Sequence, residues 1–167
     1  MYIQRLPLAS AAGHLLLHNV VDEAGKRVLR KGVRLGQAQL AQLQSLGWQE
    51  VEVAVLQADD VWEDEAASQL AAALQSEALD VAWGVGGRAN FHTTVSGVFV
   101  VDIERLRAIN LFPGLTLATL PQFSVVHPRF ATENETNRQG DQVATLKVIP
   151  YALPLTVVKQ ALAIAAA

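Results

Sequence analysis

The stretch from Leu15 to Val55 has the most regular pattern in this chain and most narrowly limits its fold. Its first part, residues 15–21, is an apolar run that fits a largely buried strand. Residues 22–25 (DEAG) are typical of a turn, because Gly25 can adopt a positive φ without a Cβ clash. Val28 and Leu29 then resume an extended pattern. The first half of the stretch therefore predicts a strand, a turn and a short second strand.

The second half of the stretch predicts a helix followed by a strand. Leu40, Leu43 and Leu46 recur at helical spacing, and Gly47 follows where a C-terminal cap belongs. Valines at alternate positions in 51–55 then give the period of two that is typical of a strand with one buried face. This unit defines a scaffold and contains no catalytic motif.

Composition excludes several classes of protein. The chain has 167 residues, of which 51% are hydrophobic and only 17% are charged, so it can bury a sizeable core and should not be disordered. Its net charge of -3 argues against a general nucleic-acid binder, which would present a basic face. No apolar run approaches the roughly 20 residues that span a bilayer, and the N-terminus lacks the pattern of a signal peptide. We therefore expect a cytoplasmic protein without nucleic-acid or membrane partners.

Metal and thiol chemistry have little support in the sequence. There is no cysteine, which excludes disulfides, thiolate catalysis and cysteine-ligated metals. His14 and His18 are four residues apart, but in a strand that spacing separates them by about 13 Å. A bend in the strand is the better interpretation of His18 and Asn19. We expect no metal site and no catalytic residues in this chain.

The rest of the chain alternates helices and short strands. Asp60 and Glu63 have the spacing of a capping box and predict a helix that reaches Ala78. Asp102 is a candidate N-cap for a second short helix. Residues 1–13 and 129–139 show no periodic pattern, and the latter are expected to form an exposed loop. Further predicted elements are a hairpin of 90–95 and 98–101 around Ser96-Gly97, strands at 115–120, 123–126 and 142–149, and a final helix starting at Pro154.

The glycine-rich segment 79–89 (LDVAWGVGGRA) is predicted to link two halves of the chain. It matches neither common phosphate-binding glycine motif, so a structural link is favoured over a phosphate-binding loop. The predicted organisation is a strand-turn-helix-strand unit at 1–58, an alanine-rich helix and glycine-rich link at 59–89, and a β-rich lobe with a C-terminal helix at 90–167. The two halves could also form one compact domain.

Basic residues give one candidate binding site. Lys and Arg cluster between positions 26 and 34, where they either protect an exposed hairpin edge or bind an anion. Arg88 directly follows the glycines and could contribute to the same site. The candidate anion-binding residues are Arg30, Lys31, Arg34, Arg88, Asn90 and Lys147.

Five segments occur in an order that resembles the N-terminal part of molybdopterin-binding proteins related to molybdenum-cofactor biosynthesis enzymes. They are HLLLHNVVDEAGKRVLRKGVRL, DEAASQLAAAL, GRANF, ATLP and GDQVATLKVIPYALP, and together they cover nearly the whole chain. The sequence differs from that pattern by a longer segment between Val126 and Gly140.

The resemblance implies a non-catalytic domain that assists ligand handling or assembly. Molybdopterin would be the cofactor concerned, a phosphorylated pterin the ligand, and the molybdopterin-binding module a separate domain after this segment. The resemblance also implies an α+β fold with a β-rich, barrel-like or clip-like core and about four peripheral helices, which agrees with the pattern of elements. The alternative is an interaction or dimerisation module without a small-molecule ligand, in which the alanine-rich helix contributes to a homo-oligomer.

Overall fold

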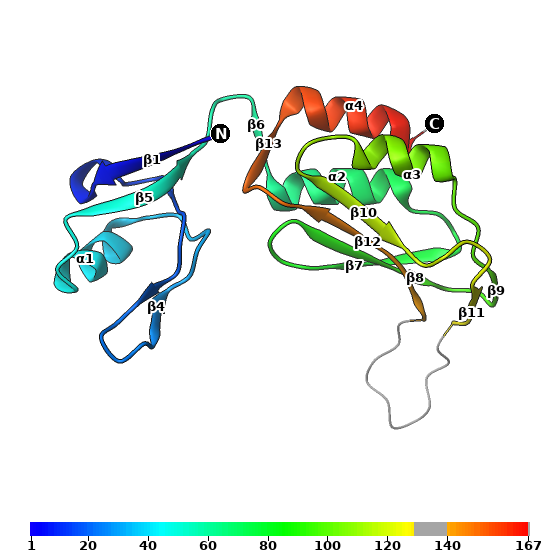
Figure 1. Cartoon of the computed structure of the whole chain (residues 1–167), viewed down its shortest axis with the longest axis horizontal. Helices are drawn as coiled ribbons and strands as arrows, with labels where there is room; N and C mark the ends of the chain where they lie inside the picture. The colour runs from blue at the N-terminus through cyan, green and yellow to red at the C-terminus, as the bar shows by residue number, and fades with distance from the viewer. Residues whose placement is uncertain (129–139, 167) are drawn as a thin grey trace. The chain divides into compact units, whose positions relative to one another are not determined.

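The computed structural model describes residues 1–128 and 140–166. The chain forms two compact units, Met1–Asp60 and Val61–Ala167, and each is described here by itself (Figure 1). The boundary between the two units follows Asp60, two residues beyond the end of the predicted first part at residue 58. The exposed loop that we expected at 129–139 lies outside the described residues.

The first unit contains a three-stranded antiparallel sheet, a hairpin and one helix. Its sheet has the strand order β1-β5-β2, and β3 pairs with β4 in the hairpin. The elements are β1 (Tyr2–Pro7), the 3-10 turn η1 (Leu8–Ser10), β2 (Leu15–Leu16), β3 (Val20–Val21), β4 (Arg27–Leu29), α1 (Gln37–Ser45) and β5 (Glu50–Val55). The predicted order of strand, turn, strand, helix and strand is confirmed. The structure adds β1, in a segment that was expected to be irregular.

Local chemistry explains the turns of this unit. The Asp22 carboxylate accepts hydrogen bonds from the backbone N–H groups of Ala24 (3.1 Å) and Lys26 (2.8 Å), and Gly25 has a φ of 77°. The first predicted strand is interrupted at His18 and Asn19, as expected. Apolar residues of both sheet and helix then fill one core, whose buried members are Ala11, Leu16, Val20, Leu29, Leu35, Leu43, Val51 and Val53.

The second unit is a four-stranded antiparallel sheet whose order is β10-β12-β8-β7, with three helices packed on one face (Figure 1). Its elements are β6 (Asp60–Trp62), α2 (Glu63–Leu74), β7 (Leu79–Trp83), β8 (Arg88–Thr93), β9 (Gly97–Val98), α3 (Ile103–Asn110), β10 (Leu115–Thr119), β11 (Val125–Val126), β12 (Gln142–Val148), β13 (Ala152–Pro154) and α4 (Leu155–Ala165). Alanines of α2 are buried in this core with Leu70, Phe91 and Leu146. The alanine-rich face therefore packs within its own unit.

The glycine-rich segment belongs to the second unit. Residues 79–83 and 88–93 are paired strands, and the glycines form the turn between them. Gly87 has a φ of 71°, and an added Cβ there would lie 2.8 Å from the Val148 carbonyl oxygen. The segment thus closes a hairpin at a crowded position, where a link between two halves was expected.

Two local predictions in this unit were wrong. Asp60 lies in β6 and accepts a hydrogen bond from the Gln57 N–H (2.7 Å), so it does not cap α2, which begins after Trp62. Strand β9 pairs with β11 and not with β8, so no hairpin forms around Ser96-Gly97. In both places long-range pairing overrides a local signal. The predicted Asp102 cap of α3 is confirmed by its hydrogen bond from the Arg105 N–H (3.0 Å).

The fold is α+β, as predicted. The strands of the described residues form several small sheets, and none of them closes into a barrel. No helix in the described part of the chain is both long and apolar enough to cross a membrane.

Candidate functional site

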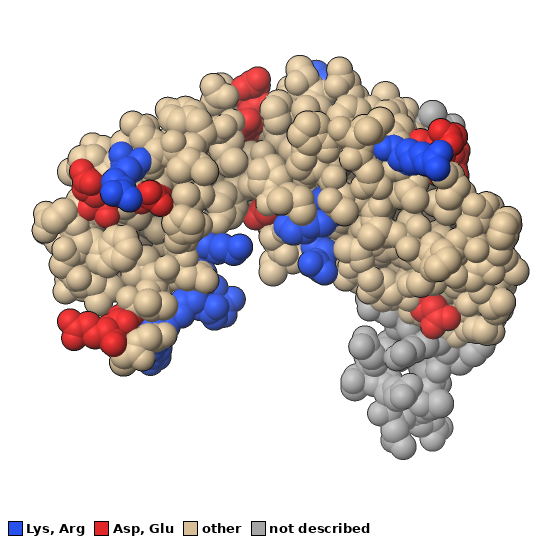
Figure 2. All heavy atoms as spheres, in the orientation of Figure 1, with Lys and Arg blue, Asp and Glu red and all other residues tan. Residues whose placement is uncertain are grey.

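The structure places the predicted anion-binding residues in two groups. Arg30, Lys31 and Arg34 belong to the first unit, and Arg88, Asn90 and Lys147 belong to the second. In the view of Figure 2, charged side chains form separate small clusters on a mostly uncharged surface.

In the second unit the sheet brings three predicted residues together. Arg88 lies directly opposite Lys147 in the β8–β12 register, and Asn90 is two residues further along the same face. The Asn90 side-chain oxygen accepts a hydrogen bond from the Thr145 hydroxyl (2.9 Å). That hydroxyl in turn accepts a hydrogen bond from the Gln142 side-chain amide (2.7 Å). These bonds orient the Asn90 amide, leaving its N–H₂ group as a donor beside the exposed Arg88.

Lys147, however, is already bound within the protein. Its ammonium donates to the carbonyl oxygens of Gly86 and Val148 and lies 3.7 Å from the Glu63 carboxylate. The Gly87 N–H donates to the Asp64 carboxylate (2.6 Å). A carboxylate of the protein therefore occupies the backbone donor that a phosphate-binding loop would offer to a phosphate. Arg88 and Asn90 are therefore the better members of this group.

In the first unit the basic residues follow the β3–β4 hairpin. The Arg34 guanidinium donates to the Gly13 carbonyl oxygen (2.6 Å), and the Lys31 backbone N–H donates to the Asn19 side chain (2.8 Å). Arg30, Lys31 and Arg34 are all exposed, and none forms an ion pair with another described residue. They fit the charged hairpin edge that was the alternative to an anion site.

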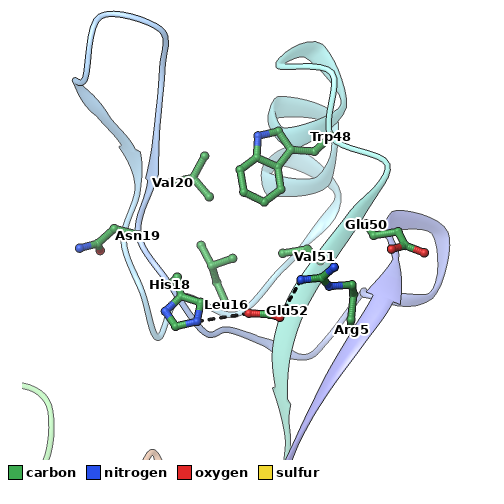
Figure 3. A pocket seen from close by; sticks show the side chains of 9 residues that line it. All are labelled: Arg5, Leu16, His18, Asn19, Val20, Trp48, Glu50, Val51 and Glu52. Atoms are coloured by element: carbon green, nitrogen blue, oxygen red, sulfur yellow. Dashed lines mark hydrogen bonds and ion pairs between the residues drawn. The ribbon is translucent and has the colours of Figure 1, made fainter.

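The first unit contains a pocket that the sequence did not reveal (Figure 3). Its volume is about 340 Å³. The lining residues are Arg5, Leu16, His18, Asn19, Val20, Trp48, Glu50, Val51 and Glu52.

Apolar side chains form the floor and one wall of this pocket. Leu16, Val20 and Val51 are buried core residues. The Trp48 indole lies beside them in Figure 3 and is 39% exposed. Trp48 is held in the turn after α1, where its backbone N–H donates to the Leu43 carbonyl oxygen (3.1 Å). The pocket thus offers one flat aromatic face next to an aliphatic floor.

A charged group forms the opposite rim. One oxygen of Glu52 accepts from the Arg5 guanidinium (2.9 Å), and the other lies 3.3 Å from His18 Nε2. The three residues come from β5, β1 and the bend after β2, so only the folded sheet assembles them. Because Arg5 and Glu52 neutralise each other, this rim does not present a free cation to a phosphate.

The sequence contained only a weak signal for the pocket. Trp48 follows Gly47 in a turn, where a large aromatic residue has no obvious core role. Arg5 lies in a segment without a periodic pattern, so nothing indicated that it would reach Glu52. Among the described residues, no group of three or more His, Asp or Glu side chains could hold a metal ion.

Comparison with known proteins adds one finding. The model of a family described as "Domain of unknown function (DUF8806)" matches residues 5–55. Neither the curated proteins nor the solved structures yielded a match to this chain. All nine residues that line the pocket lie within the matched segment.

Proposed function

We propose that this chain is a non-catalytic ligand-handling domain, and that the pocket of the first unit binds the flat ring of a small molecule. One observation supports this most directly: the exposed Trp48 face lies beside a floor of buried aliphatic side chains. Aromatic side chains contribute to ligand binding by stacking on planar groups while shielding them from water.

The size and charge of the pocket support a ring as its occupant. A volume of about 340 Å³ lies at the lower end of the range for small-molecule sites. Arg5 and Glu52 pair with each other at the rim, and the Glu50 carboxylate is turned away from Trp48 (Figure 3), so none of these side chains needs a charged ligand. A largely neutral, planar molecule is therefore the best match.

The resemblance to molybdopterin-binding proteins suggests a pterin as that ring. On this proposal the domain holds or delivers a pterin, and the chemistry belongs to a separate domain. Arg88 and Asn90 remain a predicted anion site of the second unit by itself, and a role for them in holding the phosphate of a phosphorylated pterin is a separate proposal.

Titration with pterin tests the proposed pocket. The chain has three tryptophans, and the Trp48 indole N–H signal can be assigned in an NMR spectrum by its loss in Trp48→Ala. We expect pterin to shift that signal saturably, and Trp48→Ala to weaken binding at least about fivefold, since stacking contributes about 1–3 kcal/mol. Trp83→Ala is the matched control, because Trp83 is 56% exposed in the other unit. If Trp48→Ala binds pterin as well as Trp83→Ala does, the proposal is wrong.

A second candidate function, homo-oligomer assembly, is favoured by one exposed surface of the second unit. Val98 pairs with Val125, and Phe99 and Phe123 continue the two strands through the bond from the Phe123 N–H to the Phe99 carbonyl oxygen (2.8 Å). The outward side chains of this apolar ribbon are 57–69% exposed: Val98, Val100, Phe123 and Val125. Exposed apolar clusters of this kind mark protein interaction surfaces. The alanine-rich helix α2 is less suitable, because its alanines fill the core of its own unit.

A further inference from the structure

The pocket of the first unit lies where two strands separate. Strand β2 pairs with β5 only through Leu15 and Leu16, and the last bond between these segments joins the Leu17 N–H to the Glu52 carbonyl oxygen (3.0 Å). Beyond it the chain bends away at His18, and the Asn19 side chain holds the bend by accepting from the Lys31 N–H (2.8 Å). No strand of the described residues therefore covers this edge of β5 at Glu50.

The backbone of Glu50 faces the uncovered edge. Backbone N–H and C=O groups of successive strand residues point to opposite edges. The Gln49 carbonyl oxygen accepts from the Leu8 N–H (3.1 Å) on the β1 side, whereas the Glu52 carbonyl oxygen accepts from Leu17 on the β2 side. Glu50 has the same direction as Glu52, so its N–H and C=O point toward the pocket.

Figure 3 supports this assignment. The Glu50 side chain is turned away from Trp48, and the Asn19 side chain points away from the pocket as well. Glu50 thus lines the pocket mainly through its backbone. An adjacent N–H donor and C=O acceptor on a strand edge match any partner that offers the complementary pair, as a neighbouring strand does.

We propose that the pocket selects planar nitrogen heterocycles that carry a lactam edge, in which a ring N–H adjoins a ring C=O. The lactam N–H donates to the Glu50 carbonyl oxygen, and the lactam oxygen accepts from the Glu50 N–H. Trp48 stacks on the ring, and the neutral Arg5–Glu52 pair at the rim favours an uncharged ligand. This inference rests on the proposed ring-binding function and adds the feature of the ring that is recognised.

Two matched probes test the inference in the full chain. Quinazolinone is a planar bicycle with a lactam edge, and its N-methyl derivative replaces the lactam hydrogen with a methyl group. We expect quinazolinone to shift the Trp48 indole signal and to move the Glu50 amide proton downfield. The N-methyl derivative should bind at least about tenfold more weakly, since it loses one hydrogen bond and leaves the Glu50 carbonyl blocked by a methyl group.

A side-chain variant separates backbone recognition from recognition by the carboxylate. Glu50→Ala keeps the backbone groups, so its affinity for quinazolinone should stay within about twofold of the original. If Glu50→Ala loses binding tenfold, or if both probes bind equally well, the inference is wrong while ring binding stands. If neither probe shifts the Trp48 signal, both the inference and the proposed function fail.

Discussion

At the scale of single residues, the charged side chains of the candidate site differ in whether they already have partners within the protein. Lys147 and Arg88 are neighbours across two strands, and like charges at directly opposed positions repel. Lys147 relieves this repulsion by reaching Glu63 and the carbonyl groups of the glycine turn. Arg88 forms no ion pair with the described residues, so of the two side chains only Arg88 carries an unpaired charge.

Tyr151 gives a prediction at this scale. Burial and then the negative charge of Glu63 raise the pKa of Tyr151 above its ordinary value of 10.0. The folded state therefore holds the phenol proton more tightly than the unfolded chain does. The resulting stabilisation is complete below pH 10 and is lost as the pH rises from there through the raised pKa.

We expect the free energy of unfolding of the original chain to fall relative to that of Tyr151→Phe above pH 10, because only the original chain carries the Tyr151 phenol, which loses its proton there more readily when unfolded than when folded. Urea unfolding at pH values on both sides of 10, with tyrosinate absorbance as a second signal, measures the difference. A constant difference across that range would show that Tyr151 has the same pKa in both states.

At the scale of elements, the glycine turn between β7 and β8 connects three parts of the second unit. The Gly87 N–H binds Asp64 of α2 (2.6 Å), and the Gly87 carbonyl oxygen accepts from the Val148 N–H of β12 (2.8 Å). A side chain at this position would need space that β12 occupies. The turn therefore fixes the start of α2 against the sheet.

Two adjacent glycines of this turn provide a matched comparison. Gly86 and Gly87 have φ values of 74° and 71°, so alanine is strained at either position by about 1–2 kcal/mol. Only at Gly87 would the new Cβ lie within 3.0 Å of other atoms, those of Val148 and Glu63. We expect Gly86→Ala to cost about 1 kcal/mol of stability and Gly87→Ala about 3 kcal/mol or more in urea unfolding. Equal losses would mean that the turn adjusts freely and that the crowding has no energetic effect.

At the scale of the whole molecule, the apolar ribbon carries the prediction about assembly. Phe123 has a φ of 67° and is 69% exposed, so a strained backbone presents a large apolar side chain to solvent. Asparagine tolerates this conformation better than phenylalanine does. Phe123→Asn should therefore keep or raise the thermal midpoint while it weakens any self-association.

Light scattering over a dilution series measures this effect. We expect a concentration-dependent dimer that Phe123→Asn shifts toward monomer, whereas Leu111→Asn, at an 82% exposed position outside the ribbon, leaves it unchanged. A chain that is monomeric at every concentration would rule out the assembly function.

How far the sequence predicted the structure depended on the range of the interactions. The helix at 37–45, the strand at 50–55 and the Asp102 cap follow from contacts within a few residues, and all three were predicted. The capping box at Asp60 and the hairpin around Ser96-Gly97 were also local signals, yet strand pairing with distant residues overrode both. The three predicted anion ligands of the second unit share one sheet face because of the β8–β12 register, which no local pattern contains.

The sequence by itself determined the strand-turn-helix-strand unit, since alternating valines, spaced leucines and turn glycines act over short distances. Only the tertiary structure decided that β1 covers one edge of β5 while β2 leaves the other edge open at Glu50. That choice forms the pocket and brings Arg5 to Glu52, 47 residues away in the chain. Hydrogen-bonding direction along a strand is the same for every sequence, so which backbone groups stay uncovered depends on where the neighbouring strands end.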